Sequence, residues 1–358
     1  MFRRQSEGNL LPLTADPAAP VSQDGTIRPL SAFPTGGRGS GGRILAQGAV
    51  TLSDDGRFLL TVSPGSNEVS CFLVTPSGLQ LASKVSSGGV LPVSVTVYGD
   101  LVYVVNAVSY GLPPVTPGLD GVGKGRIVGF RIDPNGVLAP LVESGRDLST
   151  SNSWPAQISF SPDGRLLVIT EIIANRITIF PVDEDGATGE MIENESAGRG
   201  PFGFAYNSRG FLVVSDSGSI FADDSTVSSY EVSAAGKITV VSAAVPTNQA
   251  AACWTANTPD ARYVYTSNTT SGTITGFSVS QGGRLTILNP NGRTAFTGAL
   301  SGPADIVISA NGQFLDVLAQ GSQTILTFRI GGDGSLTLLS SVGNLPPLAI
   351  GLAIGTDM

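Results

Sequence analysis

Hydrophobic and polar positions form a repeating pattern, seen most clearly over residues 160–186, FSPDGRLLVITEIIANRITIFPVDEDG. This stretch contains two runs of strand length, a D-G turn near each end and a single acid, Glu171, between the runs. Alternating apolar positions bounded by Gly-bearing turns are typical of antiparallel strand pairs. The pattern therefore predicts a β-hairpin, and it raises the question of why a carboxylate ends so apolar a run.

The hairpin unit occurs six times along the chain. Besides the stretch above, regular copies begin at Leu52, Thr258 and Ile308, and less regular copies begin at Val97 and Tyr206. A small-residue strand such as GPADIVI precedes each copy, and a strand such as SLTLLSS follows it. Four strands in a period of about 40–50 residues predict the blades of a β-propeller.

The four strand types do not occur equally often. The innermost and outermost types occur seven times if residues 48–53, 346–354 and 26–32 are included, but the two middle types occur six times. We therefore predict an all-β, seven-bladed propeller of four-stranded antiparallel blades, with the seventh blade shared between the two ends of the chain. Residues 1–23 would supply its middle strands, but LPLTADPAAPVSQ carries three prolines, which strand ladders resist. Two interpretations stay open: an incomplete seventh blade, or a chain start that differs from that of related proteins.

Several of these motifs resemble the seven-bladed lactonase family, which includes 6-phosphogluconolactonase-like and carboxymuconate cyclase-like propellers. The resemblance rests on SDDGRFLLTVSPGSNEVSCFLV, PVSVTVYGDLVYVVNA, SPDGRLLVITE, PFGFAYNSRGFLVVSD and ACWTANTPDARYVYTSN, and it spans residues 24–354. It implies lactone chemistry on a small molecule. We accordingly expect an irregular N-terminal segment over residues 1–23 and a single propeller domain over residues 24–358, acting as a monomer.

Composition narrows the chemistry that this fold could carry. The chain has 358 residues and no histidine, which excludes Ser-His-Asp triads, His-ligated metals and imidazole acid–base catalysis. Its two cysteines, Cys71 and Cys253, lie far apart and are expected to be buried thiols. The formal net charge of -8 argues against a nucleic-acid partner, because phosphate binding needs a basic surface.

The sequence shows no sign of a membrane partner. No apolar run approaches the roughly 18 residues that a membrane-spanning helix needs. The start, MFRRQSEGNLLPLT, lacks the sustained apolar core of a signal peptide. We therefore expect a cytoplasmic protein, with secretion as the alternative if a further segment precedes this start.

Polar residues end the second strand of successive blades: Asn106, Glu171, Asp216, Asn268 and Gln320. In a four-stranded meander these ends share one face with the links between blades, whereas the D-G and N-G turns lie on the opposite face. We call these the link face and the turn face. The pattern predicts a polar pocket at the rim of the central channel, where Glu171 would not be buried among apolar neighbours.

The links add arginines, which are suited to bidentate capture of carboxylate or phosphate. We predict Glu171 as the general base, with Asp216 as the second acid, and we expect Arg199 and Arg146 to orient an anionic substrate. The predicted substrate-binding residues are Asn106, Gln157, Asn268, Gln320 and Trp154. The family resemblance implies the same roles for acids and arginines at this face. It also implies a histidine in the cyclase branch, which this chain lacks.

Three functions stay open. The first is hydrolysis or formation of the lactone of a small acidic or sugar-derived molecule, with residues 107–125 as a lid. The second is a cyclase or isomerase of a specialised pathway, and the third is a non-catalytic propeller that binds a ligand or protein. No cofactor is expected. A divalent cation held by carboxylate and amide oxygens of several blades is a weaker hypothesis, because no D-x-D-x-D-G loop occurs.

Overall fold

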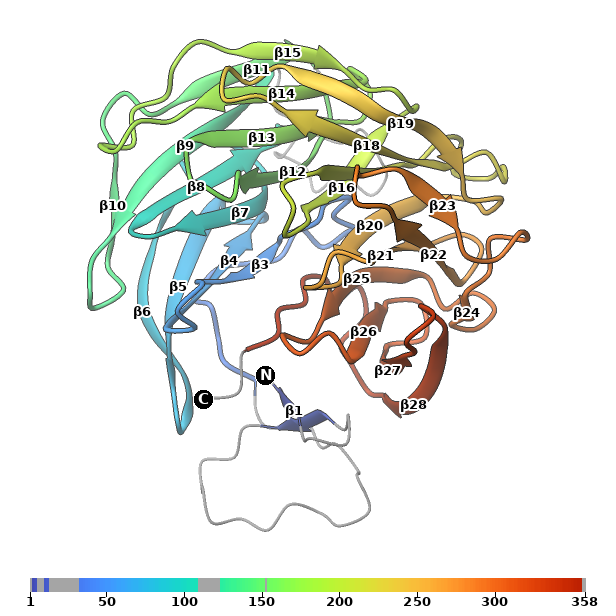
Figure 1. Ribbon diagram of the computed structural model, residues 1–358. Helices are drawn as coiled ribbons and strands as arrows, with labels where there is room; N and C mark the ends of the chain where they lie inside the picture. Colours follow the sequence, from blue (N-terminus) through green and yellow to red (C-terminus); the bar gives the residue numbers. More distant parts are fainter. Residues whose placement is uncertain (1, 5–9, 13–31, 109–122, 152, 356–358) are drawn as a thin grey trace.

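The computed structural model describes residues 2–4, 10–12, 32–108, 123–151 and 153–355. These residues form strands and turns without any helix, and most of the strands belong to six antiparallel sheets arranged around a common centre (Figure 1). The described part therefore contains no helix that is long and apolar enough to cross a membrane. The prediction of an all-β propeller with four-stranded antiparallel blades is confirmed.

The first three blades follow the chain in order. Blade 1 comprises β3 (Val50–Leu52), β4 (Phe58–Ser63), β5 (Glu68–Thr75) and β6 (Gly78–Ser86). Blade 2 comprises β7 (Pro92–Tyr98), β8 (Leu101–Asn106) and β9 (Lys124–Ile132), with β10 (Leu138–Pro140) and β11 (Arg146–Ser151) both paired to β9. Blade 3 comprises β12 (Pro155–Phe160), β13 (Leu166–Glu171), β14 (Arg176–Pro181) and β15 (Ile192–Glu195).

The other three blades repeat this order. Blade 4 comprises β16 (Pro201–Tyr206), β17 (Leu212–Asp216), β18 (Thr226–Val232) and β19 (Ile238–Pro246). Blade 5 comprises β20 (Ala252–Asn257), β21 (Tyr263–Asn268) and β22 (Thr273–Val279), with β23 (Leu285–Ile287) and β24 (Ala295–Phe296) both paired to β22. Blade 6 comprises β25 (Pro303–Ile308), β26 (Phe314–Ala319), β27 (Thr324–Ile330) and β28 (Leu336–Val342).

The core lies between blades, because each sheet is apolar on both faces of its middle strands. Leu101 and Tyr103 of blade 2 share one cluster with Leu167 and Ile169 of blade 3. The opposite faces of the same strands pack on the blades beyond them. A single blade could not bury these faces alone, so radial stacking supplies the hydrophobic stabilisation.

The turn between the third and fourth strands docks each blade on the one before it. The glycine in each turn has a positive φ of 73–83°, and its carbonyl accepts a hydrogen bond from a side chain of the preceding blade. The five donor–glycine pairs are Ser83–Gly136, Tyr103–Gly186, Asn194–Gly236, Ser229–Gly283 and Tyr265–Gly334. The sequence suggested ordinary hairpin turns here, whereas the structure shows that they also connect the blades.

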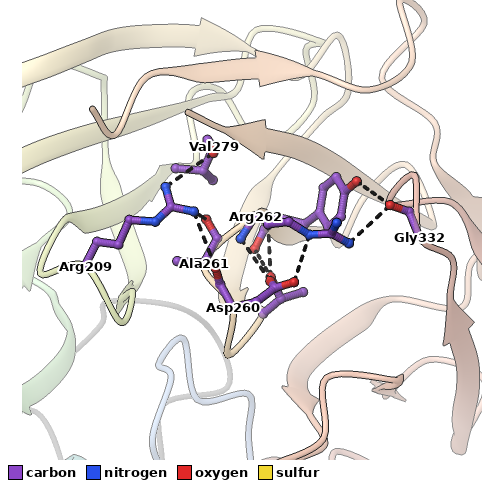
Figure 2. Close-up of polar contacts among 8 residues, drawn as sticks. Arg209, Asp260, Ala261, Arg262, Val279 and Gly332 are labelled. Carbon is purple, nitrogen blue, oxygen red and sulfur yellow. Dashed lines mark hydrogen bonds and ion pairs between the residues drawn. The ribbon is translucent and has the colours of Figure 1, made fainter. Parts of the chain in front are cut away.

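Arginines strengthen the same face between blades 4, 5 and 6 (Figure 2). The Arg209 guanidinium donates to the carbonyl of Ala261 at 2.7 Å. Arg262 pairs with Asp260 at 2.8 Å and donates to the carbonyl of Gly332 at 3.2 Å. The turn face is thus occupied by bonds that hold neighbouring blades together.

The described residues form six blades, whereas the sequence predicted seven. β1 (Phe2–Arg4) and β2 (Leu10–Pro12) form a separate antiparallel pair within the segment that we expected to be irregular. The predicted outer strand over 26–32 lies outside the described residues except for Ala32. The predicted inner strand over 346–354 is wrong, because those of its residues that follow Pro346 and Pro347 run without strand pairing.

We predict that Gly186→Ala destabilises the protein more than Gly210→Ala. Both glycines have φ above +80°, so both variants incur backbone strain of about 1–2 kcal/mol. A β-carbon at Gly186 would also lie 2.7 Å from Leu101 and Leu141, whereas nothing lies within 4 Å at Gly210. Overpacking adds about 1–3 kcal/mol to the cost at Gly186. Urea unfolding of both variants measures the difference, and equal losses would contradict docking through this turn.

Candidate functional site

The predicted pocket residues occupy one equivalent position in successive blades. The last residue of each second strand pairs with the first residue of the innermost strand: Asn106 with Pro92, Glu171 with Pro155, Asp216 with Pro201 and Asn268 with Ala252. In blade 6 this position is Ala319, so the predicted Gln320 lies one residue beyond it. The side chains of Asn106, Glu171, Asp216 and Asn268 each face the preceding blade, because they continue the strand face that packs on it.

Glu171 is completely buried at the interface between blades 2 and 3. Ser149 of β11 donates to its Oε2 at 2.8 Å, and the Thr178 hydroxyl donates to its Oε1. Burial raises the pKa of Glu171, and hydrogen bonds from these hydroxyls oppose the rise. The expectation that this carboxylate avoids burial is wrong, because it continues the apolar face that Leu167 and Ile169 present to blade 2.

Asp216 repeats this arrangement between blades 3 and 4. It is fully buried and accepts hydrogen bonds from Ser228 at 2.7 Å and from Thr226 and Ser196 at 3.1 Å. Ser196 follows the outermost strand of blade 3, so this carboxylate also joins two blades. Burial raises the pKa of Asp216 to about 7, because the three hydroxyls compensate only in part for lost solvation.

Other predicted residues use their polar atoms to hold strands together. The Gln157 amide accepts from the backbone N–H of Phe204 at 2.7 Å and donates to its carbonyl at 3.0 Å. The Arg146 guanidinium donates at 2.7 Å to the carbonyls of Glu143 and Thr188. These contacts link blade 3 to blade 4 and blade 2 to blade 3, respectively.

The amides Asn106 and Asn268 are buried in the same way. Asn268 donates to Thr273 and Thr275 at 3.0 and 2.8 Å, and Asn106 donates to the carbonyl of Ser87 at 3.3 Å. The Oδ1 atom of each amide is buried without a hydrogen-bond partner among the described residues. Asn106, Glu171, Asp216 and Asn268 therefore lie one to a blade, inside the interfaces.

Arg199 and Trp154 are placed differently. Arg199 is exposed in the link before β16, and its guanidinium makes no hydrogen bond or ion pair with other described residues. Trp154 is half-buried before β12, and its carbonyl accepts from the backbone N–H of Ile172 at 2.9 Å. Gly200 also lies against the Ile172 side chain. Ile172 thus connects the Trp154 and Arg199 links on one sector of the link face.

A segment near the N-terminus occupies the centre of the propeller. Gln47 donates its backbone N–H to the carbonyl of Ala156 on β12 at 2.8 Å, and its side-chain amide bonds both backbone groups of Thr255 on β20 at 3.0 Å. Trp254 Nε1 donates to the carbonyl of Ala46 at 3.1 Å. Since β12 and β20 belong to blades 3 and 5, residues 44–48 cross the channel.

Sequence reasoning missed Asp305. It is the one acid on the six described innermost strands, and it is 3% exposed on β25. Its Oδ2 accepts from the backbone N–H of Gly351 at 2.8 Å. Burial raises the pKa of Asp305 to about 7, although hydrogen bonds from Gly351 and Trp254 act to lower it. The sequence does contain a signal for this residue, because GPADIVI is the one innermost-strand motif in which an acid stands among small and apolar residues.

The family model for the lactonases with a 7-bladed β-propeller matches residues 129–255 and 224–346, which together span more than half of the chain. The chain belongs to this lactonase family. The family is seven-bladed, whereas the described residues of this member form six blades.

Similar proteins agree with this assignment. The 6-phosphogluconolactonase of Yersinia enterocolitica is 27% identical over 220 residues, which cover 58% of this chain and 62% of that protein. A structure of a candidate 6-phosphogluconolactonase from Bacteroides fragilis has a TM-score of 0.67 at 20% identity, covering 84% of this chain and 85% of that one. The periplasmic gluconolactonase of Pseudomonas aeruginosa has a TM-score of 0.59 at 23% identity, covering 80% and 83%. At these identities the structures show a common fold.

Two further predictions concern this lactonase-family chain. Cys71 and Cys253 are buried free thiols, as predicted. Of the proposed lid over residues 107–125, the part from 109 to 122 lies outside the described residues. In the part of the chain that the structure describes, no group of three or more His, Cys, Asp or Glu residues could hold a metal ion.

We predict that Asp216 makes stability depend on pH. Since burial raises its pKa from about 3.8 to about 7, the folded protein binds this proton more tightly than the unfolded chain. The resulting stabilisation is complete below about pH 4 and is lost as the pH rises through 7. Between pH 5 and pH 8, this effect should lower the unfolding free energy of the wild type by about 2–3 kcal/mol. In Asp216→Asn that contribution should be absent. Urea unfolding at both pH values tests this. An equal change in unfolding free energy with pH for the wild type and Asp216→Asn would refute it.

Proposed function

We propose that this chain is a lactone hydrolase that acts on a small anionic, sugar-derived lactone at the link face, beside Arg199 and Trp154. Family membership supports lactone chemistry, and the Yersinia relative suggests a phosphorylated aldonolactone. The observation that carries the proposal is the exposed Arg199 guanidinium. Most of the other predicted polar groups are already engaged between blades.

Arg199 can serve this reaction in two ways. A guanidinium stays charged and binds carboxylate or phosphate through two parallel hydrogen bonds. Water addition to a lactone places negative charge on the carbonyl oxygen before the ring C–O bond breaks, and a fixed cation stabilises that charge. Trp154 would contribute a flat apolar surface with a polar ring edge at the same sector.

Glu171 has a different proposed role. A general base must reach its proton directly or through one water, and the buried Glu171 carboxylate is held by Ser149 and Thr178. We propose that it positions the start of the Ile172 turn, which contacts both links. Asp216 and Arg146 are proposed to support the face in the same indirect way.

A non-catalytic binding propeller is the second candidate. Large apolar side chains are exposed in loops of the link face: Phe221 is 83% exposed and Leu300 is 90% exposed. Exposed apolar side chains on one face are a feature of partner-binding surfaces. This candidate predicts binding without turnover.

The test is a pH-stat assay on 6-phosphogluconolactone and unphosphorylated aldonolactones. We expect Arg199→Ala to lower kcat/KM by about 10–100-fold, with the larger loss on the phosphorylated substrate. Arg293→Ala is the matched control, since Arg293 is an exposed arginine between β23 and β24 of blade 5 and lies over the Phe296 ring at 5.4 Å. It should change kcat/KM less than about twofold.

Two further arms separate the alternatives. Loss of about 100-fold or more in Glu171→Gln would assign the base to Glu171, whereas a smaller loss supports a positioning role. Added chelator should leave the rate unchanged if no divalent cation takes part. Wild-type turnover no faster than spontaneous hydrolysis would overturn the hydrolase and favour the binding propeller.

A further inference from the structure

Residues 345–351, which we call the strap, follow blade 6 into the centre of the molecule. Three hydrogen bonds fix the strap to blade 6. Leu345 N–H donates to the Gln323 carbonyl at 3.1 Å, and Gln320 Nε2 donates to the Ala349 carbonyl at 3.1 Å. The third is the 2.8 Å bond from the Gly351 N–H to Asp305 Oδ2.

The strap contacts both ends of the row of blades. Ile350 packs against three core clusters, which lie between blades 1 and 2, between blades 2 and 3, and among blades 3 to 6. The Gly351 backbone lies against Val50 of blade 1. The strap therefore joins blade 6 to blade 1 through one apolar side chain and one carboxyl group.

Among the residues that the structure describes, Asp305 has no charged neighbour that compensates for its burial. The strap and residues 44–48 contain no ionisable side chain. On the adjacent strands, Trp254 supplies a hydrogen bond, Cys253 is a buried thiol, and Asp316 accepts from Thr327 at 2.7 Å. None of these groups, nor the exposed Arg43 before residue 44, exerts a charge effect on Asp305.

We propose that Asp305 is a pH-dependent latch, whose protonated form holds the strap in the centre of the propeller and whose ionised form releases it. A neutral carboxyl group tolerates this dry site, whereas a carboxylate needs water or several donors. The other neighbours of Asp305 belong to strand ladders, but the strap is held by three hydrogen bonds. Moving the strap is therefore the easiest way to hydrate the carboxylate.

The direction of the pH effect follows from the burial of the acid. Burial raises the pKa of Asp305 to about 7, and an open strap would return it toward its ordinary value near 3.8. The closed strap is thus favoured at low pH and is destabilised as the pH rises through 7. Opening should become about tenfold more favourable between pH 6 and pH 8. This device does not depend on the proposed lactonase activity.

Hydrogen exchange measured by mass spectrometry, corrected for intrinsic rates, tests the latch. In the wild type we expect protection of the amides of residues 348–351 to fall about tenfold from pH 6 to pH 8. Peptides from β8 and β13 should keep their protection. In Asp305→Asn, whose amide oxygen can still accept from Gly351, protection of the strap should not depend on pH.

Two controls make the outcome decisive. Asp216→Asn removes another buried acid that does not touch the strap, so its strap should still respond to pH. A wild-type titration adds a test that needs no variant, since the protection factor of the strap should fall about tenfold per pH unit below pH 7 and level off above it. Constant wild-type protection, an unchanged response in Asp305→Asn, or equal loss in every strand would each overturn the proposal.

Discussion

Hydrogen bonds between neighbouring blades are the constraint on which this structure depends. The blades bury their apolar faces against one another, so polar groups at each interface lose water and must find partners there. Turn glycine carbonyls meet this need at the turn face. Nearer the link face, hydroxyls of Thr170, Ser215 and Ser267 donate to carbonyls of the next innermost strand. The same demand explains why buried polar residues recur at equivalent positions of successive blades.

Neighbouring donors decide whether a strand ends in an acid or an amide. Glu171 meets hydroxyls that donate to it, so a group that only accepts is well suited. Asn106 meets the carbonyl of Ser87, which requires a donor. Asn268 meets Thr273 and Thr275, whose protons are already given to Gln249 and Gly292, so they can only accept. The acids of blades 3 and 4 therefore need no catalytic explanation.

The repeat predicted four-stranded antiparallel blades, because these follow from apolar periodicity and turn residues that are local in the sequence, although it predicted seven blades where the described residues form six. It could not predict the orientation of a strand end, which depends on the blade next to it. For this reason the sequence places Glu171 at an open rim, and it assigns to Gln320 the strand-end position that Ala319 occupies. The crossing of the channel by residues 44–48 and the burial of Asp305 depend on contacts between distant parts of the chain.

These distant contacts also limit where a substrate could bind. The centre already holds residues 44–48, which accept a hydrogen bond from Trp254, and the strap, which donates one to Asp305. A ligand would therefore approach from the link face. Within each described blade the strands are joined by ladders of many hydrogen bonds, whereas the strap is held to blade 6 by three. Local opening begins where few bonds protect a segment. Closure of the ring should therefore respond to pH before the blades do, with Asp305 as the group that senses it.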